Sequence, residues 1–93
     1  KVVAVQSQGV LQVDAKVRIY PNPAQQHTTL DLSRIPGGTY QISIIAMDGR
    51  VVRQFTAVGG DLQTIQVSDL STGKYIIRIQ SESFHQSIGL LKR

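Results

Sequence analysis

The sequence predicts an all-β fold, an Ig-like antiparallel β-sandwich of about seven strands. Apolar and polar residues alternate with a period of two in many short segments, as at Tyr40, Ile42 and Ile44. This period is the pattern of half-buried strands. Turn-forming residues separate the segments at short intervals, and no segment sustains an apolar stripe at helical spacing. Short strands with such regular turns are typical of a sandwich.

The expected strands follow from this alternation, which begins at Val17 and Ile19 and recurs at Leu30 and Leu32, and again at Ile65 and Val67. We place them near residues 16–20, 28–32, 39–46, 50–57, 62–67, 73–81 and 84–91.

The turns between these strands have their own residue signals. Pro21 and Pro23 fix φ and remove backbone donors, so this stretch ends the strand before it. Asp48-Gly49 is the strongest hairpin signal in the chain, typical of a type I′ turn with positive φ at both central residues. The remaining turns are expected at 36–38, 59–61 and 71–73.

The first residues form a separate part of the prediction. Residues 2–5 and 10–13 have strand-like patterns, with a polar stretch between them. We interpret residues 1–15 as a linker to an absent upstream domain and residues 16–93 as one domain. Because the chain lacks an initiator Met and a full signal-peptide apolar region, we interpret it as the C-terminal piece of a longer protein.

Composition narrows the classes of partner. The net charge is +4, but the ten Lys and Arg residues are spread along the chain. They form no dense basic run of the kind that binds nucleic acid, so we expect no nucleic-acid partner. These cations either solvate strand faces or contact an anionic surface such as lipopolysaccharide. Low aromatic content, 5% with no Trp, argues against an aromatic ligand platform.

No residue pattern indicates catalysis. The chain has no Cys, and its two histidines are His27 and His85. His27 and Asp31 would lie about 13 Å apart along one strand, too far to share a metal. There is no nucleophile elbow, no carboxylate pair suited to acid–base work and no phosphate-binding glycine loop. We therefore expect no enzyme activity, no cofactor and no metal.

The segment 70–75 resembles a tyrosine corner, a feature of Ig-like sandwiches. The Tyr75 hydroxyl would bond an upstream backbone group, Leu70 would cap the core, and Gly73 would take a conformation unsuited to a side chain.

The last two strands leave alternatives open. The apolar run 75–79 is either a central strand covered on both faces or an edge prone to strand addition. The run 87–93 is either a docking handle with a basic end or a plain edge strand, and it would allow a homodimer by strand exchange. Gly89 within it predicts a bulge or a close backbone approach.

The order of these motifs resembles a known family. Residues 20–24 (Tyr-Pro-Asn-Pro-Ala), 42–52 with Asp-Gly-Arg, 65–75 with Leu-x-x-Gly-x-Tyr and the basic end occur in that order. The set is similar to the C-terminal sorting domain of type IX secretion cargo in Bacteroidetes such as Porphyromonas. The resemblance covers about residues 17–93.

The resemblance implies a seven-stranded Ig-like sandwich that acts as a secretion signal. Such domains pass through the periplasm and direct their cargo across the outer membrane to the cell surface or the medium. The implied partners are the type IX translocon and a sortase. The sortase would cut before the domain, somewhere in residues 5–16, and join the cargo to anionic lipopolysaccharide. The implied sorting-motif residues are Pro21, Asn22, Pro23, Gly49, Arg50, Leu70, Gly73, Tyr75, Lys92 and Arg93.

Three other interpretations remain open from the sequence. The domain would suit a fibronectin-like or Ig-like accessory module for binding or adhesion in a secreted protein. It would also suit a plain structural spacer. The chain departs from the family pattern at Ile45-Ala46 and at Ile88-Gly89. These departures leave room for a secretion-machinery component that retains its domain.

Overall fold

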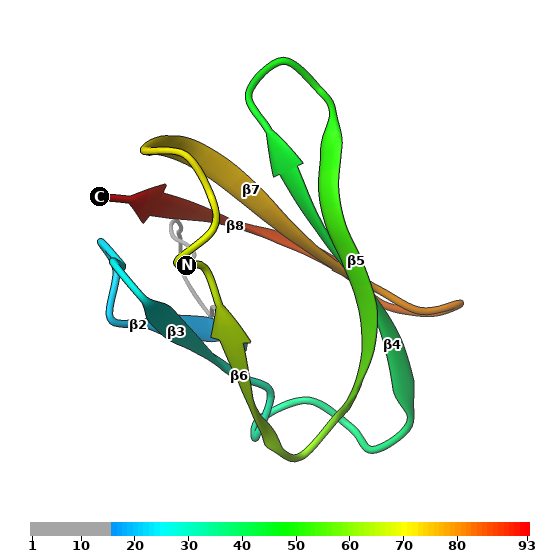
Figure 1. Ribbon diagram of the computed structural model, residues 1–93. Helices are drawn as coiled ribbons and strands as arrows, with labels where there is room; N and C mark the ends of the chain where they lie inside the picture. Colours follow the sequence, from blue (N-terminus) through cyan, green and yellow to red (C-terminus); the bar gives the residue numbers. More distant parts are fainter. Residues whose placement is uncertain (1–15) are drawn as a thin grey trace, which may run out of the picture.

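A computed structural model describes residues 16–93, and the strand and linker predictions for residues 1–15 lie outside the described residues. Within the described part there are seven strands (Figure 1). They are β2 (Arg18–Tyr20), β3 (His27–Asp31), β4 (Thr39–Ala46), β5 (Val51–Val58), β6 (Leu62–Gln66), β7 (Gly73–Gln80) and β8 (His85–Lys92). All seven predicted strands are confirmed, and no boundary moves by more than two residues. None of the described residues forms a helix long and apolar enough to cross a membrane.

The strands form two sheets whose neighbouring strands are all antiparallel. The small sheet has the order β2-β3-β6, and the large sheet has the order β5-β4-β7-β8. The two sheets face each other in Figure 1, with β5 and β6 joined by a turn at one side of the molecule. The described residues therefore form the predicted β-sandwich, with β7 as a central strand and β8 at an edge.

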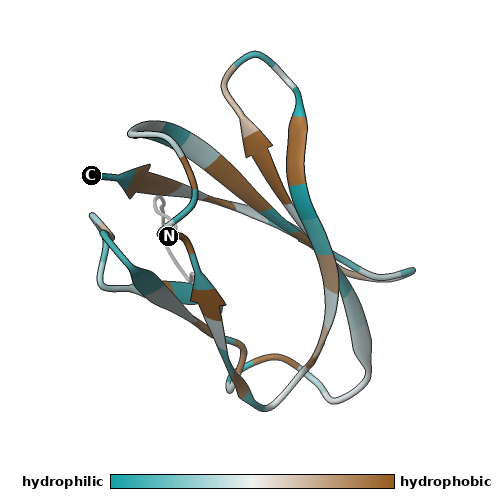
Figure 2. Ribbon diagram, viewed as in Figure 1, coloured by the Kyte–Doolittle hydropathy of each residue, from teal (hydrophilic) through white to brown (hydrophobic). Residues whose placement is uncertain are grey.

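The core lies between the two sheets. Side chains at every second position of each strand point inward, which is why the strands alternate in burial. Figure 2 shows the resulting mixture of brown and teal segments along the strands. The largest fully buried side chains include Leu30 and Leu32 from the β3 region and Ile42, Ile44, Ile77, Ile79 and Leu90 from the large sheet.

One end of the sandwich is closed by a second tyrosine corner that the sequence did not predict. The Tyr40 hydroxyl donates to the Pro36 carbonyl at 2.9 Å, and the Tyr40 ring packs edge-on against Phe84 with centroids 5.6 Å apart. Gly59 lies against this pair, and its N–H donates to the Gly38 carbonyl at 2.9 Å. The turn after β5 is thereby packed onto the turn before β4.

Asp31 is a buried carboxylate on β3. The Ser33 hydroxyl donates to Oδ1 at 2.6 Å and the Ser33 N–H donates at 3.0 Å, while the Arg18 guanidinium lies 3.6 Å from Oδ2. These hydrogen bonds, the one from the Ser33 side chain first, lower the pKa of Asp31 below its usual value, against the opposing effect of burial.

We expect the stability that Asp31 contributes to be lost in acid. A carboxyl group whose pKa is lowered on folding stabilises the fold fully above its unfolded pKa, and this contribution disappears as the pH falls through the folded pKa. Urea unfolding between about pH 5 and pH 2 should therefore show a smaller loss of stability in Asp31→Asn than in the unsubstituted chain. Parallel pH profiles for the two proteins would contradict this assignment.

Candidate functional site

The proline segment between β2 and β3 (residues 21–24) is hydrogen-bonded to the last strand, β8. The Asn22 side chain donates from Nδ2 to the Gly89 carbonyl at 3.0 Å and accepts from the Leu91 N–H at 2.9 Å. The Ala24 N–H donates to the Leu91 carbonyl and the Ala24 carbonyl accepts from the Arg93 N–H, both at 2.8 Å. Pro21 and Pro23 cannot donate, so the side chain of Asn22 makes the contacts between them. We call this set of four hydrogen bonds the clasp.

The clasp occupies backbone hydrogen-bonding groups at the end of β8. Alternate residues of an edge strand direct their N–H and C=O groups away from the sheet, and the clasp occupies those of Leu91. The backbone edge is therefore covered from Gly89 to Arg93, so strand addition at this segment would require the clasp to open. The docking handle remains a prediction. Gly89 pairs regularly with Ile76, and a Cβ atom built on it would meet nothing within 4 Å, so the predicted bulge or close backbone approach is wrong.

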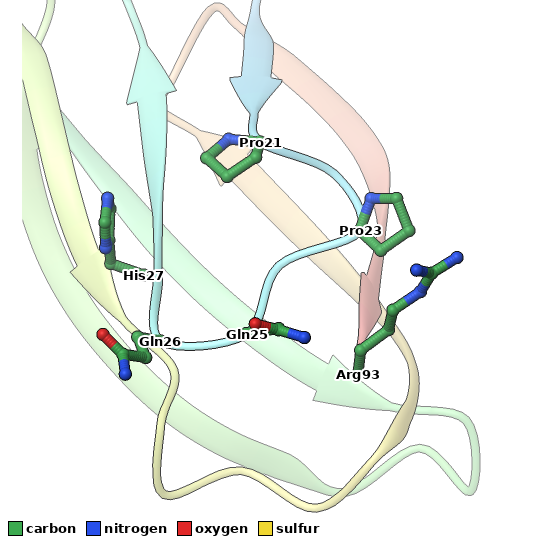
Figure 3. A pocket seen from close by; sticks show the side chains of 6 residues that line it. All are labelled: Pro21, Pro23, Gln25, Gln26, His27 and Arg93. Atoms are coloured by element: carbon green, nitrogen blue, oxygen red, sulfur yellow. The ribbon is translucent and has the colours of Figure 1, made fainter.

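The two terminal basic residues have different surroundings. Lys92 is only 7% exposed, and its Nζ donates to the Arg93 carbonyl at 2.9 Å. Arg93 is exposed and shares a hollow of about 360 Å³ with Pro21, Pro23 and His27 (Figure 3). The surface therefore presents the guanidinium of Arg93 next to the two prolines, whereas Lys92 is largely shielded.

The hairpin that joins β4 and β5 extends beyond the sheet. The Gly49 N–H donates to the Ala46 carbonyl at 2.9 Å, which places Met47 and Asp48 at the centre of the turn and Gly49 after it. Gly49 has φ +91°, and Asp48 Oδ1 accepts from the Arg50 N–H at 3.1 Å. The predicted hairpin is confirmed, but the two-residue type I′ turn centred on Asp48-Gly49 is wrong.

The predicted tyrosine corner is confirmed. The Tyr75 hydroxyl donates to the Ser71 carbonyl at 2.6 Å, while the ring is buried with 7% exposure. Leu70 packs against the core, and Gly73 has φ +152°. These three residues fix the path of the chain from β6 into β7.

We expect Tyr75→Phe to reduce stability without changing the fold. It removes one hydrogen bond and leaves the Ser71 carbonyl without that donor, at a cost of about 1 kcal/mol. The melting temperature should fall by roughly 4 to 8 °C. Tyr20→Phe is the matched control, because Tyr20 is 44% exposed and its hydroxyl donates to Asp31 over a longer distance of 3.5 Å. Equal losses in the two variants would contradict the role of the corner.

Arg53 is a residue that the sequence reasoning missed. It donates to both carboxylate oxygens of Asp69 at 2.7 Å and also to the Gln66 carbonyl. It thus joins edge strand β5 of the large sheet to the end of β6 in the small sheet. The hydrogen bond from Arg53 is the main reason that the pKa of Asp69 is lowered. Arg53 is on the same face of β5 as Phe55 and Ala57, because the three residues are two positions apart. A cation on this apolar face was the sequence feature that could have indicated its role.

The sequence-predicted motif residues, distant along the chain, lie at one end of the sandwich. The register pairs Gly73 with Lys92 and Tyr75 with Leu90, and it pairs Tyr75 with Ala46 on the other side, directly before the hairpin. The clasp brings the proline segment to the same end. We call this the motif end, formed by Pro21, Asn22, Pro23, Gly49, Arg50, Leu70, Gly73, Tyr75, Lys92 and Arg93.

The motif end offers backbone turns, apolar side chains and the exposed cations Arg50 and Arg93. Within residues 16–93 no group of three or more His, Cys, Asp or Glu side chains is placed to hold a metal ion.

Comparison with known proteins identifies the family. Residues 18–91 match the family described as the secretion system C-terminal sorting domain. No curated protein matches the chain. The matched range runs from β2 almost to the end of β8 and includes all the predicted motif residues except Lys92 and Arg93. The chain therefore belongs to the family of C-terminal sorting domains of type IX secretion.

Proposed function

We propose that this domain directs an attached protein across the outer membrane by the type IX system, acting by recognition rather than catalysis. The proposed sequence of events is periplasmic transit, recognition by the translocon, and then sortase cleavage with attachment of the cargo to anionic lipopolysaccharide. The observation that carries this proposal is the family match over residues 18–91. Family membership itself implies interaction with the secretion machinery and export to the cell surface or the medium.

The motif end lies away from the first described residue. Lys16 lines a hollow with Thr39, Tyr40 and Phe84, at the end of the sandwich that holds the β7–β8 turn. The motif end lies at the other end of β7, whose eight residues span roughly 26 Å. Lys16, where the described part of the chain begins, and the motif end therefore lie at opposite ends of the sandwich.

A reporter fusion tests the proposal. The chain is attached behind a signal peptide and a fluorescent protein that folds outside the cytoplasm, in a host with a type IX system and in a matched strain lacking the translocon. We expect reporter on the surface or in the medium of the first strain alone. Reporter that stays in the periplasm of both strains would contradict the proposal and favour a binding module or a spacer.

The finer steps have their own readouts in the same strains. With the sortase present, we expect a reporter shortened by the domain and carrying a heterogeneous lipopolysaccharide mass. Without the sortase, the exported reporter should keep the full domain. Export of the full-length fusion in both sortase backgrounds would contradict cleavage and indicate a domain that is retained.

A further inference from the structure

An apolar row crosses the outer face of the large sheet near the motif end. The register places Val51 opposite Ile45, Ile45 opposite Ile76, and Ile76 opposite Gly89, one residue from each strand. Their sequence neighbours Ile44 and Ile77 point into the core and are fully buried, so the row faces outward. Val51 is 52% exposed. Figure 2 shows the end of β4 and the start of β5 in brown beside the hairpin.

The next outward row of the same sheet is polar. Ser43 lies opposite Gln54 on one side and Arg78 on the other, and Arg78 lies opposite Ser87. The apolar row is therefore a local feature of this face.

The row ends in a hollow at Gly89. The hollow has a volume of about 250 Å³, and its walls include Met47, Ile76 and Leu91. Met47 is 66% exposed and Leu91 is 36% exposed, so neither side chain is buried in the core. A Cβ atom built on Gly89 would meet nothing within 4 Å. The hollow is open because this strand position carries no side chain.

The outer face of the large sheet is positively charged near the hollow, which indicates a partner with negative charge. Lys74 and Arg78 flank Ile76 on the outward side of β7, and both are exposed. None of the four strands of the large sheet contains an Asp or Glu. Asp48 in the adjoining hairpin is the carboxylate next to Met47. Two copies of the domain meeting through these strands would bring the cations Lys74 and Arg78 together without a carboxylate from the strands themselves. A partner with carboxylates beside an apolar side chain complements both features.

We propose that the hollow at Gly89 receives an apolar side chain from an acidic segment of the secretion machinery, whose carboxylates pair with Lys74 and Arg78. This inference rests on the proposed function and assigns the contact surface for it. An apolar anchor in a pocket with a charged rim is a common arrangement in protein interfaces. The row, in which Val51 is exposed and Ile45 and Ile76 are half-buried, then extends the apolar contact on one side of the anchor.

Filling the hollow tests the proposal in the same reporter fusion. Gly89→Leu places a side chain in the hollow lined by Met47 and Leu91. We expect the fold to tolerate it, because Gly89 has no left-handed φ and a Cβ atom there would meet nothing within 4 Å. We expect exported reporter to fall at least about tenfold, the factor that corresponds to about 1.4 kcal/mol of binding. Gly37→Leu is the matched control at the opposite end, where a Cβ also meets nothing within 4 Å, and it should export normally.

A charge reversal gives a second test that does not depend on packing. Lys74→Glu with Arg78→Glu should lower export several-fold, whereas Lys74→Arg with Arg78→Lys should keep it. Thermal unfolding of each purified variant verifies that the domain is folded. Normal export by a folded Gly89→Leu variant, or by the charge-reversed variant, would overturn the inference while leaving the proposed function intact.

Two further outcomes also decide the matter. If the unsubstituted fusion itself is not exported, the proposed function fails and this inference fails with it. If sedimentation shows that the unsubstituted chain dimerises and that Gly89→Leu abolishes the dimer, the occupant is a second copy, which overturns the assignment to the secretion machinery. A monomeric chain with impaired export of Gly89→Leu supports the assignment.

Discussion

Gly59→Ala is expected to be the most destabilising small substitution in the described part of the domain. The added Cβ would lie 1.9 Å from the Pro36 carbonyl oxygen and 2.7 Å from the Tyr40 ring. The first of these atoms is backbone, so the turn after β5 or the turn before β4 has to move. Overpacking typically costs about 1 to 3 kcal/mol, and a clash with backbone lies at the upper end, so we expect about 3 kcal/mol. The melting temperature should fall by roughly 12 to 24 °C.

Gly37→Ala is the matched control for this prediction. It lies in the adjoining turn, has no left-handed φ and would place its Cβ in open space. Its effect should stay within about 1 kcal/mol and in the stabilising direction, because alanine reduces the conformational freedom of the unfolded chain. Similar unfolding curves for the two variants would show that Gly59 is not a close-packed position.

Asn22→Ala is expected to weaken the clasp more than any other substitution of a single exposed side chain. It removes the hydrogen bonds to the Gly89 carbonyl and the Leu91 N–H. Two such bonds contribute about 1 to 3 kcal/mol. Amide exchange at Leu91 should accelerate by roughly 5- to 150-fold, the factors that correspond to about 1 and 3 kcal/mol. Export of the reporter should fall because the end of β8 is no longer held in place.

The released edge has a second expected consequence. An uncovered edge strand is a template for pairing with another chain, so Asn22→Ala should increase dimerisation by strand exchange. Sedimentation at several concentrations measures this. Gln25→Ala is the control, because Gln25 is exposed on the same segment. If Leu91 exchanges at the same rate in both variants, the clasp does not hold β8.

Truncation of residues 90–93 is a weaker test of the same surface. We expect it to abolish export while the cargo still folds, but Leu90 is 2% exposed and belongs to the core. The truncation therefore removes core packing together with the end of β8. Asn22→Ala separates the two effects because it leaves the core untouched.

Local patterns in the sequence determined the strands and several turns. The alternation at Tyr40, Ile42 and Ile44 predicts β4, because a half-buried strand has one face toward the core and one toward solvent. The corner at Tyr75 was predictable because its hydrogen bond reaches only four residues back. The family resemblance added the set of motif residues. These features depend on neighbours along the chain, so one sequence is enough to reveal them.

Contacts between distant segments were decided by the tertiary structure alone. Asn22 reaches Gly89 and Leu91 across 67 and 69 residues, and Arg53 reaches Asp69 between the two sheets. The burial of Lys92 and the hollow at Gly89 also depend on which strands become neighbours. Alternation predicts which residues share a face, but strand order and register decide what lies opposite them. The strands could therefore be predicted from the sequence, whereas the surface at the motif end is formed only when the strands pair.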